Sequence, residues 1–286
     1  MANTIPYGST PVLKDQDEVF ANLSERKPPA DYYGGKPWKC QIGSVLFTSD
    51  GSRWTTSPTV VFNQYFGIVL PSLAAANAAT YSQTGNLITV TSTAHDIPAT
   101  VHNGKRVYIG GATVTTGAAI SAGLYDSFQM IDANTFTCVN PVSQSASGTL
   151  ATQTSTFTIP GVSYTIPGGS LSENGYFDTY HMSWCNASAG TKRMSFLYGT
   201  FSYKNPAPGS TAVAIEENHR LWNNNALNKQ IAFAAGSPGN SGPVTTVPVT
   251  GTQDSTTDKA ITVQLTLNTA SDYITLERLM ITLFYG

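Results

Sequence analysis

The C-terminal segment 259–286 carries the strongest structural pattern in the chain. Residues 261–267 alternate between aliphatic side chains and Thr or Gln, which is the period of a strand with one buried face. In the next run, 273–285, the aliphatic residues change parity, from Ile274 and Leu276 to Leu279, Ile281 and Leu283. Either a β-bulge near Arg278 shifts the register or both faces of the strand are covered. We expect this strand inside a sheet, because an exposed apolar edge would promote aggregation.

Composition indicates an all-β protein. Only 11% of the 286 residues are charged, against roughly 25% in ordinary globular proteins. Thr, Ser, Ala, Gly and Asn take their place, and β-branched and turn-forming residues favour strands. The hydrophobic content of 41% is enough to build cores, which argues against disorder.

Charge, cysteine count and hydropathy narrow the function classes. The net charge is −2 and no basic cluster exceeds two residues, which argues against nucleic-acid binding. The cysteines Cys40, Cys138 and Cys185 lie far apart and form neither a disulfide framework nor a zinc motif, so we expect reduced thiols. The sequence shows no signal peptide and no apolar run of membrane-helix length. These features predict a soluble protein that is not inserted in a membrane.

The first two segments differ in character from the rest. Residues 1–56 are the most charged part and mix Pro-interrupted sequence with a short helix expected near 15–25 and a β-hairpin expected at 43–54. We interpret them as an arm that attaches to another protein; a flexible tail is the alternative. Residues 57–85 begin apolar and end Ala-rich, and we expect a connector there with at most one helical turn.

The remaining segments are expected to be β structure separated by a linker. Residues 86–147 predict a small β module, 148–171 an extended linker, and 172–286 an antiparallel sandwich, most simply a jelly roll. The strands expected in the module are 87–91, 106–109, 127–131 and 135–139, with a tight turn at 132–134. Those expected in the sandwich are 177–184, 193–203, 212–217, 229–235, 245–250, 260–268 and 273–285.

Two groups of motifs resemble bacteriophage proteins. Segments 88–95, 104–111 and 131–136 resemble a small β module inserted in many phage tail and fibre proteins, although Asp96 and Ile97 stand where that module usually has Gly and Leu. Segments 187–193, 218–233 and 272–281 are similar to the C-terminal sandwich of small phage virion proteins and fibres, and the 43–54 hairpin is similar to one near the start of such chains. The resemblance touches about two-thirds of the chain and implies a virion protein with a spacer module.

Catalytic and metal motifs are weak. The loop 239–243 is similar to the nucleophile loop of trypsin-like proteases, but it lacks the second glycine and the context of a catalytic histidine. Adjacent Glu216 and Glu217 point to opposite faces of a strand and cannot act as a pair. On a strand, His181 and Cys185 lie about 13 Å apart, too far to share an ion. We predict no enzyme, no cofactor and no metal ligand.

Glycan recognition is the surface chemistry that the sequence favours. It needs aromatic faces together with amide and charged hydrogen-bonding groups, and one segment that we expect to be a loop offers this combination. The candidate residues are Arg220, Trp222, Asn223, Asn224 and Asn225. For Trp222, packing in a core or between subunits is the alternative.

These observations lead us to expect a non-enzymatic structural protein of a tailed-phage virion, assembled in the host cytoplasm. We expect a tail fibre or tail knob whose C-terminal domain binds a host-surface glycan; a capsid decoration or head fibre protein is the alternative, and a polysaccharide-degrading enzyme the second. Residues 1–56 would contact other virion proteins. The double parity of the final strand, the Ala-rich segment 73–80 and the low charge favour a homotrimer.

Overall fold

The structure is a computed structural model of the chain. It describes the backbone of residues 18–20, 38–42, 45–49 and 54–55. It describes backbone and side chains of residues 58–73, 79–93, 95, 97–98, 102–151, 156–187, 192–204, 214–232, 248–267, 269 and 272–284.

The protein is all-β, as predicted, with a mixed sheet of eleven strands and two sheets of four strands. The strands in chain order are β1 Glu18–Phe20, β2 Trp38–Ile42, β3 Val45–Ser49, β4 Trp54–Thr55, β5 Thr59–Pro71, β6 Thr80–Thr91, β7 Arg106–Ile109, β8 Ala112–Thr116, β9 Gly123–Asp132, β10 Thr135–Leu150, β11 Phe157–Ile166, β12 Tyr176–Cys185, β13 Lys192–Tyr198, β14 Phe201–Lys204, β15 Ala214–Asn223, β16 Gln230–Ala232, β17 Val249–Gly251, β18 Lys259–Leu267 and β19 Tyr273–Phe284.

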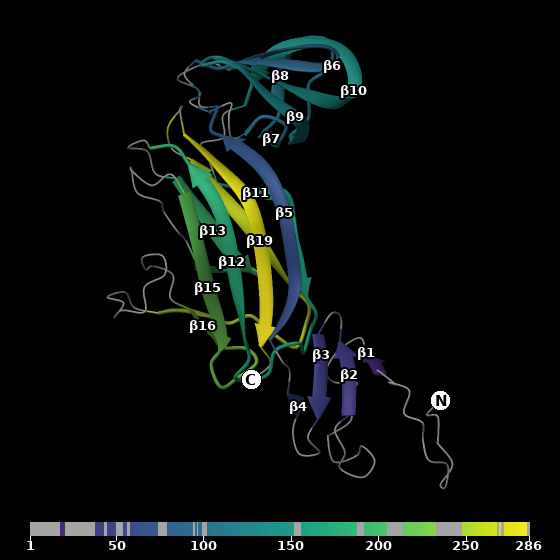
Figure 1. Cartoon of the computed structure of the whole chain (residues 1–286), viewed down its shortest axis with the longest axis vertical. Helices are drawn as coiled ribbons and strands as arrows, with labels where there is room; N and C mark the ends of the chain where they lie inside the picture. Colours follow the sequence, from purple (N-terminus) through teal and green to yellow (C-terminus); the bar gives the residue numbers. More distant parts are fainter. Residues whose placement is uncertain are drawn as a thin grey trace.

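A sandwich forms the middle of the molecule (Figure 1). One layer is the stretch β17-β16-β15-β12-β19-β5 of the large sheet, and the other is the antiparallel sheet β11-β18-β13-β14. Side chains from both layers form one hydrophobic core, in which Phe177, Phe196 and Leu279 are fully buried. In β18 the aliphatic residues of the predicted alternation are the buried ones. Period-two patterning thus places one face of each strand in the core.

A second core lies in a small β module made by β6 to β10 at one end of the sandwich (Figure 1). The large sheet runs into the module without a break, because β7 pairs with β5 in parallel at Ile68↔Arg106 and Val69↔Val107. Lys105 of the module also forms an ion pair with Glu277 of β19. The module and the sandwich therefore share backbone hydrogen bonds as well as side-chain contacts.

The final strand lies inside the sheet, as expected, between β12 and β5. Its pairing with β12 jumps from Ser183↔Leu276 to Met182↔Arg278, so Glu277 is the extra residue of a β-bulge. The bulge carries the aliphatic residues on both sides of it into the sandwich core, and they are Ile274, Leu276, Leu279, Ile281 and Leu283. Both alternatives from the sequence hold in part, because the bulge shifts the register and Tyr273 and Thr275 are buried on the other face at the module end of the strand. The change of parity therefore no longer supports burial between copies of the chain.

Two segments expected to connect domains contain strands of the sandwich. Within the connector predicted over 57–85, residues 59–71 form β5, and β6 begins at residue 80. Within the linker predicted over 148–171, residues 157–166 form β11. β5 was not predicted because its apolar residues do not alternate with polar ones. Ile68, Val69 and Leu70 are all fully buried, two in the sandwich core and one in the module core. β11 contains Pro160 and Gly161, where the pairing with β18 is interrupted.

The chain order also corrects the expected position of the module. The module is inserted between β5 and β11, and β5 runs from Thr59, which pairs with Leu283 at one end of the sheet, to Pro71, which pairs with Tyr273 at the other. The module lies at this second end (Figure 1). It is therefore not a spacer between the N-terminal segment and the sandwich, since the chain enters the sandwich at the end opposite the module.

The other expected elements are recovered with shifted ends. The four module strands and the tight turn after Asp132 are present, and Thr135 pairs with Asp132. The run 193–203 is two strands, β13 and β14, separated at Gly199, whose φ of 59° favours glycine. The hairpin at 43–54 is present as β3 paired with β4. The helix expected near 15–25 is wrong at Glu18–Phe20, which forms a strand parallel to β2.

The segments 187–193 and 272–281 meet in the structure. Lys192 and Asp272 are both fully buried, and their charged groups lie 3.6 Å apart.

Within the described residues, no helix is long and apolar enough to cross a membrane.

Candidate functional site

The predicted segment around Trp222 is mostly a strand. Arg220 and Trp222 lie on β15, which ends at Asn223, so the expectation of a loop is wrong for these three residues. Asn224 and Asn225 follow in a turn, where the N–H of Asn224 donates to the carbonyl of Lys229 and Asn225 has a φ of 53°. Asparagine tolerates this left-handed conformation better than most residues. Arg220 and Trp222 are therefore held on the outer face of a sheet.

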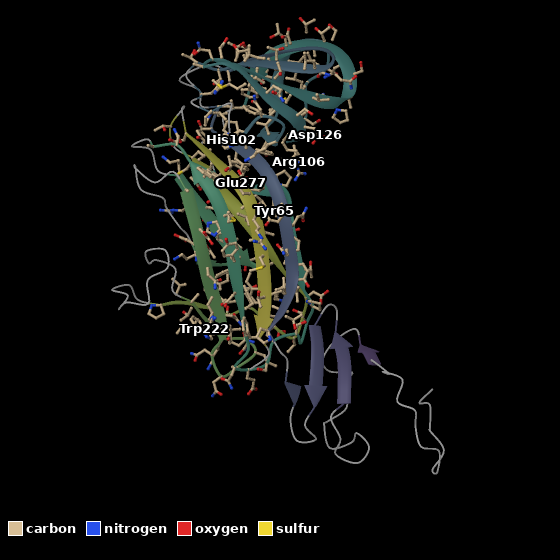
Figure 2. The ribbon with its side chains drawn as sticks, viewed as in Figure 1. Tyr65, His102, Arg106, Asp126, Trp222 and Glu277 are labelled. Carbon is tan, nitrogen blue, oxygen red and sulfur yellow. The ribbon has the colours of Figure 1, made fainter. Side chains whose placement is uncertain are left out.

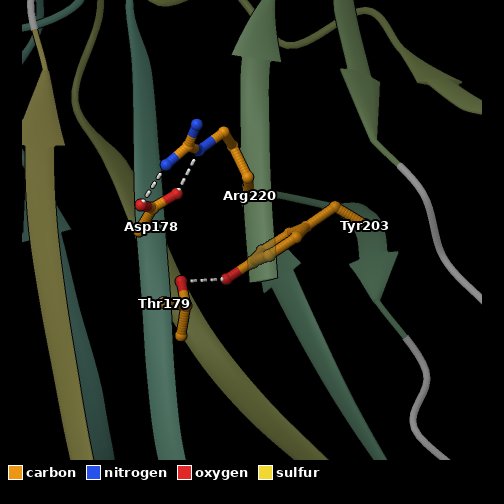
Figure 3. Close-up of polar contacts among 4 residues, drawn as sticks. All are labelled: Asp178, Thr179, Tyr203 and Arg220. Carbon is orange, nitrogen blue, oxygen red and sulfur yellow. Dashed lines mark hydrogen bonds and ion pairs between the residues drawn. The ribbon is translucent and has the colours of Figure 1, made fainter. Parts of the chain in front are cut away.

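Arg220 is fixed by Asp178 on the neighbouring strand β12. Its Nε and Nη2 donate to the two carboxylate oxygens of Asp178 at 2.5 and 2.6 Å (Figure 3), and the two residues are direct cross-strand partners. Such a bidentate pair fixes the plane of the guanidinium group. The hydrogen bond from Arg220 to Asp178 raises the pKa of Arg220 further above its usual value.

Aromatic rings surround this ion pair. The guanidinium carbon of Arg220 lies 4.2 Å from the ring centroid of Tyr176, 5.7 Å from Trp222 and 5.6 Å from Phe284. Tyr176 stacks on Phe284 with centroids 4.2 Å apart and planes 13° apart. The result is a platform of Tyr176, Arg220, Trp222 and Phe284 drawn from three adjacent strands, which we call the aromatic platform.

A hollow adjoins the aromatic platform where β15 ends. It has a volume of about 330 Å³ and is lined by Asn174, Trp222, Asn223, Asn224 and Ile231. In Figure 2, His102 and Arg106 lie at the module end of the molecule, and Trp222 lies at the opposite end of the sandwich. The hollow thus combines one indole with the amide groups of two exposed asparagines, Asn174 and Asn224.

Asn223 holds the strand end together. It is only 3% exposed; its Nδ2 donates to the carbonyl of Ser172 at 2.7 Å, and its Oδ1 accepts from Gln230 and from Ser255. These bonds use most of its capacity. Of the five predicted residues, Trp222, Asn223 and Asn224 line the hollow. Arg220 lies in the adjoining aromatic platform, and Asn225 lies in the turn.

Sequence reasoning missed Asn174, Tyr176, Asp178, Ile231 and Phe284. Tyr176 is the cross-strand partner of both Trp222 and Phe284. The strands themselves were predicted, but their pairing was not, and only the register brings these side chains together. Knowledge of how β12 pairs with β15 and β19 would have been needed to predict that Tyr176, Asp178 and Phe284 lie beside Arg220 and Trp222.

A second group of aromatic residues lies further along the same outer face. The guanidinium of Arg278 lies 5.0 Å from the ring of Tyr65 and 5.7 Å from that of Tyr180, and Tyr65 is 70% exposed. The hydroxyl of Tyr180 donates to Glu216 at 2.6 Å, which raises the pKa of Tyr180. Trp184, 37% exposed, lies at the module end of β12.

Inside the sandwich, the structure brings together three polar side chains that the sequence analysis did not combine. His181, Glu217 and His219 are buried, and one potential ligand atom from each lies within 4.8 Å of the others. Burial lowers the pKa of His181 to about 3 and that of His219 to about 2. Both histidines are therefore neutral at physiological pH, the form that binds metals.

The weak catalytic motifs gain no support. Glu216 is exposed and Glu217 buried, so these neighbours face opposite sides of β15, as predicted. His181 and Cys185 are both buried on β12. The protease-like loop 239–243 lies outside the described residues.

Comparisons of the chain with protein-family models, with curated protein sequences and with solved structures find no match.

Proposed function

We propose that this chain is a non-enzymatic structural protein of a tailed-phage virion, of the tail fibre or tail knob type, and that its sandwich binds a host-surface glycan beside Trp222. The observation that carries the binding proposal is the hollow of about 330 Å³ next to a preformed aromatic platform. Virion membership rests on the motif resemblance described above, and the glycan proposal rests on the site.

The fold proposed for the sandwich is a jelly roll. One layer contains the order β5-β19-β12-β15 and the other the order β11-β18-β13-β14. Numbering these eight strands B to I along the chain gives B-I-D-G and C-H-E-F, the interleaved order of two Greek keys. In this assignment the module is an insertion between strands B and C, and β16 and β17 lie between G and H. Lectin and virus capsid domains are among the proteins that use jelly rolls.

The chemistry of the site suits a sugar better than an apolar ligand. A pyranose ring presents C–H groups on its faces and hydroxyls at its edge, so it needs an aromatic face beside hydrogen-bonding groups. Trp222 supplies the face, and the amides of Asn174 and Asn224 supply donors and acceptors. Arg220 is already held by Asp178, so ordering it on binding costs little entropy.

The partners in this proposal are other copies of the chain, in a homotrimer, and virion proteins contacted through residues 1–56. A capsid decoration or head fibre protein is the alternative position on the virion. The chain enters the sandwich at Thr59, next to Leu283 and hence at the same end as Trp222. Whether the hollow faces outward on the particle therefore distinguishes receptor binding from decoration.

Trp222→Ala tests the proposal. Purified protein is titrated onto host cells and onto their isolated surface polysaccharide, and the variant is expected to bind at least about tenfold more weakly, equivalent to about 1.4 kcal/mol. The matched control is Trp184→Ala, which removes a partly exposed indole from the same face at the opposite end of β12 and is expected to bind like wild type.

Equal binding by wild type and Trp222→Ala would overturn the glycan site. Release of reducing sugar or acetate from the polysaccharide would contradict the non-enzymatic assignment and favour the depolymerase alternative.

A further inference from the structure

We propose that His181, Glu217 and His219 bind one divalent transition-metal ion, with zinc the best fit, inside the sandwich. The site is separate from the surface hollow, and the inference does not depend on the proposed function.

The three side chains converge because of strand pairing. His181 on β12 lies directly opposite Glu217 on β15, and His219 lies two residues further along β15, on the same face, opposite Thr179. Alternate residues of a strand share a face, so all three point into the sandwich. The rings of His181 and His219 have centroids 5.1 Å apart, and Phe196 of the other layer packs against both rings.

The potential ligand atoms of these side chains form no hydrogen bonds, although Nε2 of His219 and Oε2 of Glu217 lie close together. Among the described residues, both ring nitrogens of His181, Nε2 of His219 and Oε2 of Glu217 are buried without a hydrogen bond, and the three residues are 0%, 5% and 8% exposed. Burying a polar atom without a hydrogen bond costs about 1–3 kcal/mol. A cluster of such atoms is expensive unless something between them is bound.

A zinc ion would bind three of these four atoms, one from each residue, because only one ring nitrogen of His181 can ligate it. Two neutral imidazoles and one carboxylate are a common zinc ligand set. Ligand atoms about 2.0–2.1 Å from a tetrahedral ion lie about 3.3 Å from one another. Nε2 of His219 and Oε2 of Glu217 are already 3.1 Å apart, and the remaining separations of up to 4.8 Å close by small rotations of the side chains.

Lys204 is the competing partner for Glu217. It lies on β14, is 7% exposed, and interacts electrostatically with Glu217 and both histidines. However, no hydrogen bond or ion pair joins Lys204 to Glu217 within the described residues. Lys204 therefore leaves Oε2 of Glu217 without a hydrogen bond.

The role that follows for the ion is structural. The ligands come from two adjacent strands of one layer, and Phe196 of the other layer packs against both histidine rings. An ion there cross-links β12 to β15, the two strands that also carry Asp178 and Arg220. Substrates have no access to so buried a site.

Metal binding is measured on full-length protein prepared without a histidine tag. After treatment with a chelator and dialysis, zinc is added back and quantified by mass spectrometry, and the proposal predicts one zinc per chain. Zinc at a hundred times its Kd is expected to raise the Tm by about 5–10 °C. Cobalt(II) added in place of zinc is expected to give the strong visible absorption of a tetrahedral site, a test that needs no variant. Absence of both the stoichiometric zinc and the cobalt spectrum would overturn the proposal.

Variants locate the site. Glu217→Gln and His219→Gln are expected to lose the zinc-dependent rise in Tm, and Lys204→Met is expected to bind zinc more tightly because a competing charge is gone. The matched control is His102→Gln, which alters a buried histidine of the module and is expected to keep the full rise. Retention of zinc by His219→Gln together with loss of zinc by His102→Gln would contradict the assignment.

Discussion

At the scale of the residue, the clearest feature is how firmly Arg220 is held. Asp178 binds two of its nitrogens and Tyr176 lies beneath its plane. The pair is partly exposed, so it adds little to stability, about 0–1 kcal/mol. Its consequence is geometric: it presents a fixed, flat, charged group beside Trp222, and this preorganisation is what a binding surface requires.

His102 is a second residue with a measurable consequence. It is 1% exposed and packs edge-on against Tyr273, with ring centroids 5.5 Å apart. Burial and, to a smaller extent, the charge of Lys105 lower its pKa from 6.5 to about 4, against an opposing effect of Glu277. The folded protein therefore keeps His102 neutral at pH values where the unfolded chain protonates it.

Stability is expected to fall as the pH drops from about 6.5 toward about 4, because the unfolded state then binds the proton that the folded state refuses. At about pH 5 the loss from His102 is at most about 2 kcal/mol. Urea unfolding at neutral pH and at about pH 5 measures it, and His102→Gln is expected to lose less stability between these two values than wild type. An equal loss in both proteins would contradict the depressed pKa.

Prediction of candidate residues from the sequence depends on chemistry that is local in the chain. Arg220, Trp222 and Asn224 lie within one short segment, so a single sequence can group them as candidates. Asp178, by contrast, lies 42 residues before Arg220 in the sequence. Likewise, nothing in the sequence indicates that His181 faces Glu217 and His219. Only the register of β12 against β15 joins these groups, and a single sequence does not contain that register.

At the scale of the element, β19 is informative because its bulge explains how aliphatic residues of both parities along the strand reach the same core. Glu277 is the extra residue opposite β12, and both Glu277 and Arg278 lie on the outer side, where they contact Lys105 and Tyr65. Leu279, Ile281 and Leu283 are fully buried. At about 1.5–3 kcal/mol each, these three side chains contribute about 5–9 kcal/mol, comparable with the total stability of a typical domain.

Two single-residue deletions in β19 are expected to differ. Deleting Glu277 removes the bulge opposite β12 and leaves Leu279, Ile281 and Leu283 facing the core, although it adds to the irregular pairing with β5, where two residues already lie opposite Glu277. Deleting Met280 turns Ile281 and Leu283 to the outer face. Urea unfolding is expected to show the larger loss for the Met280 deletion. Glu277→Ala serves as a control that removes only the ion pair with Lys105, at a cost of about 1 kcal/mol. A Glu277 deletion that proves the more damaging of the two would contradict this account of the bulge.

Element prediction failed where alternation is absent. β18 and the second half of β19 were predictable because buried residues alternate with partly exposed ones. β5, by contrast, is buried on both faces at Ile68, Val69 and Leu70. A strand between two cores reads as a continuous apolar run. β11 has the opposite problem, because Pro160 and Gly161 at an irregular point of its pairing resemble a linker.

At the scale of the whole molecule, the insertion of the module between β5 and β11 determines the arrangement. Two hydrophobic cores share the continuous sheet through β5 and β7. The module lies at one end of the sandwich, and Trp222 lies at the other, where the chain enters (Figures 1 and 2). The order of segments in the sequence predicts an arm, a spacer and a sandwich arranged one after another. The long-range strand pairing shows instead that the module is inserted between two strands of the sandwich.

Electron cryomicroscopy of the phage particles that we propose contain this chain is the most direct test of the host-binding proposal. We expect three copies around a threefold axis, with residues 1–56 against other virion proteins and the hollow beside Trp222 open to solvent. A hollow covered by a neighbouring virion subunit would contradict the claim, because no host glycan could then reach the aromatic platform.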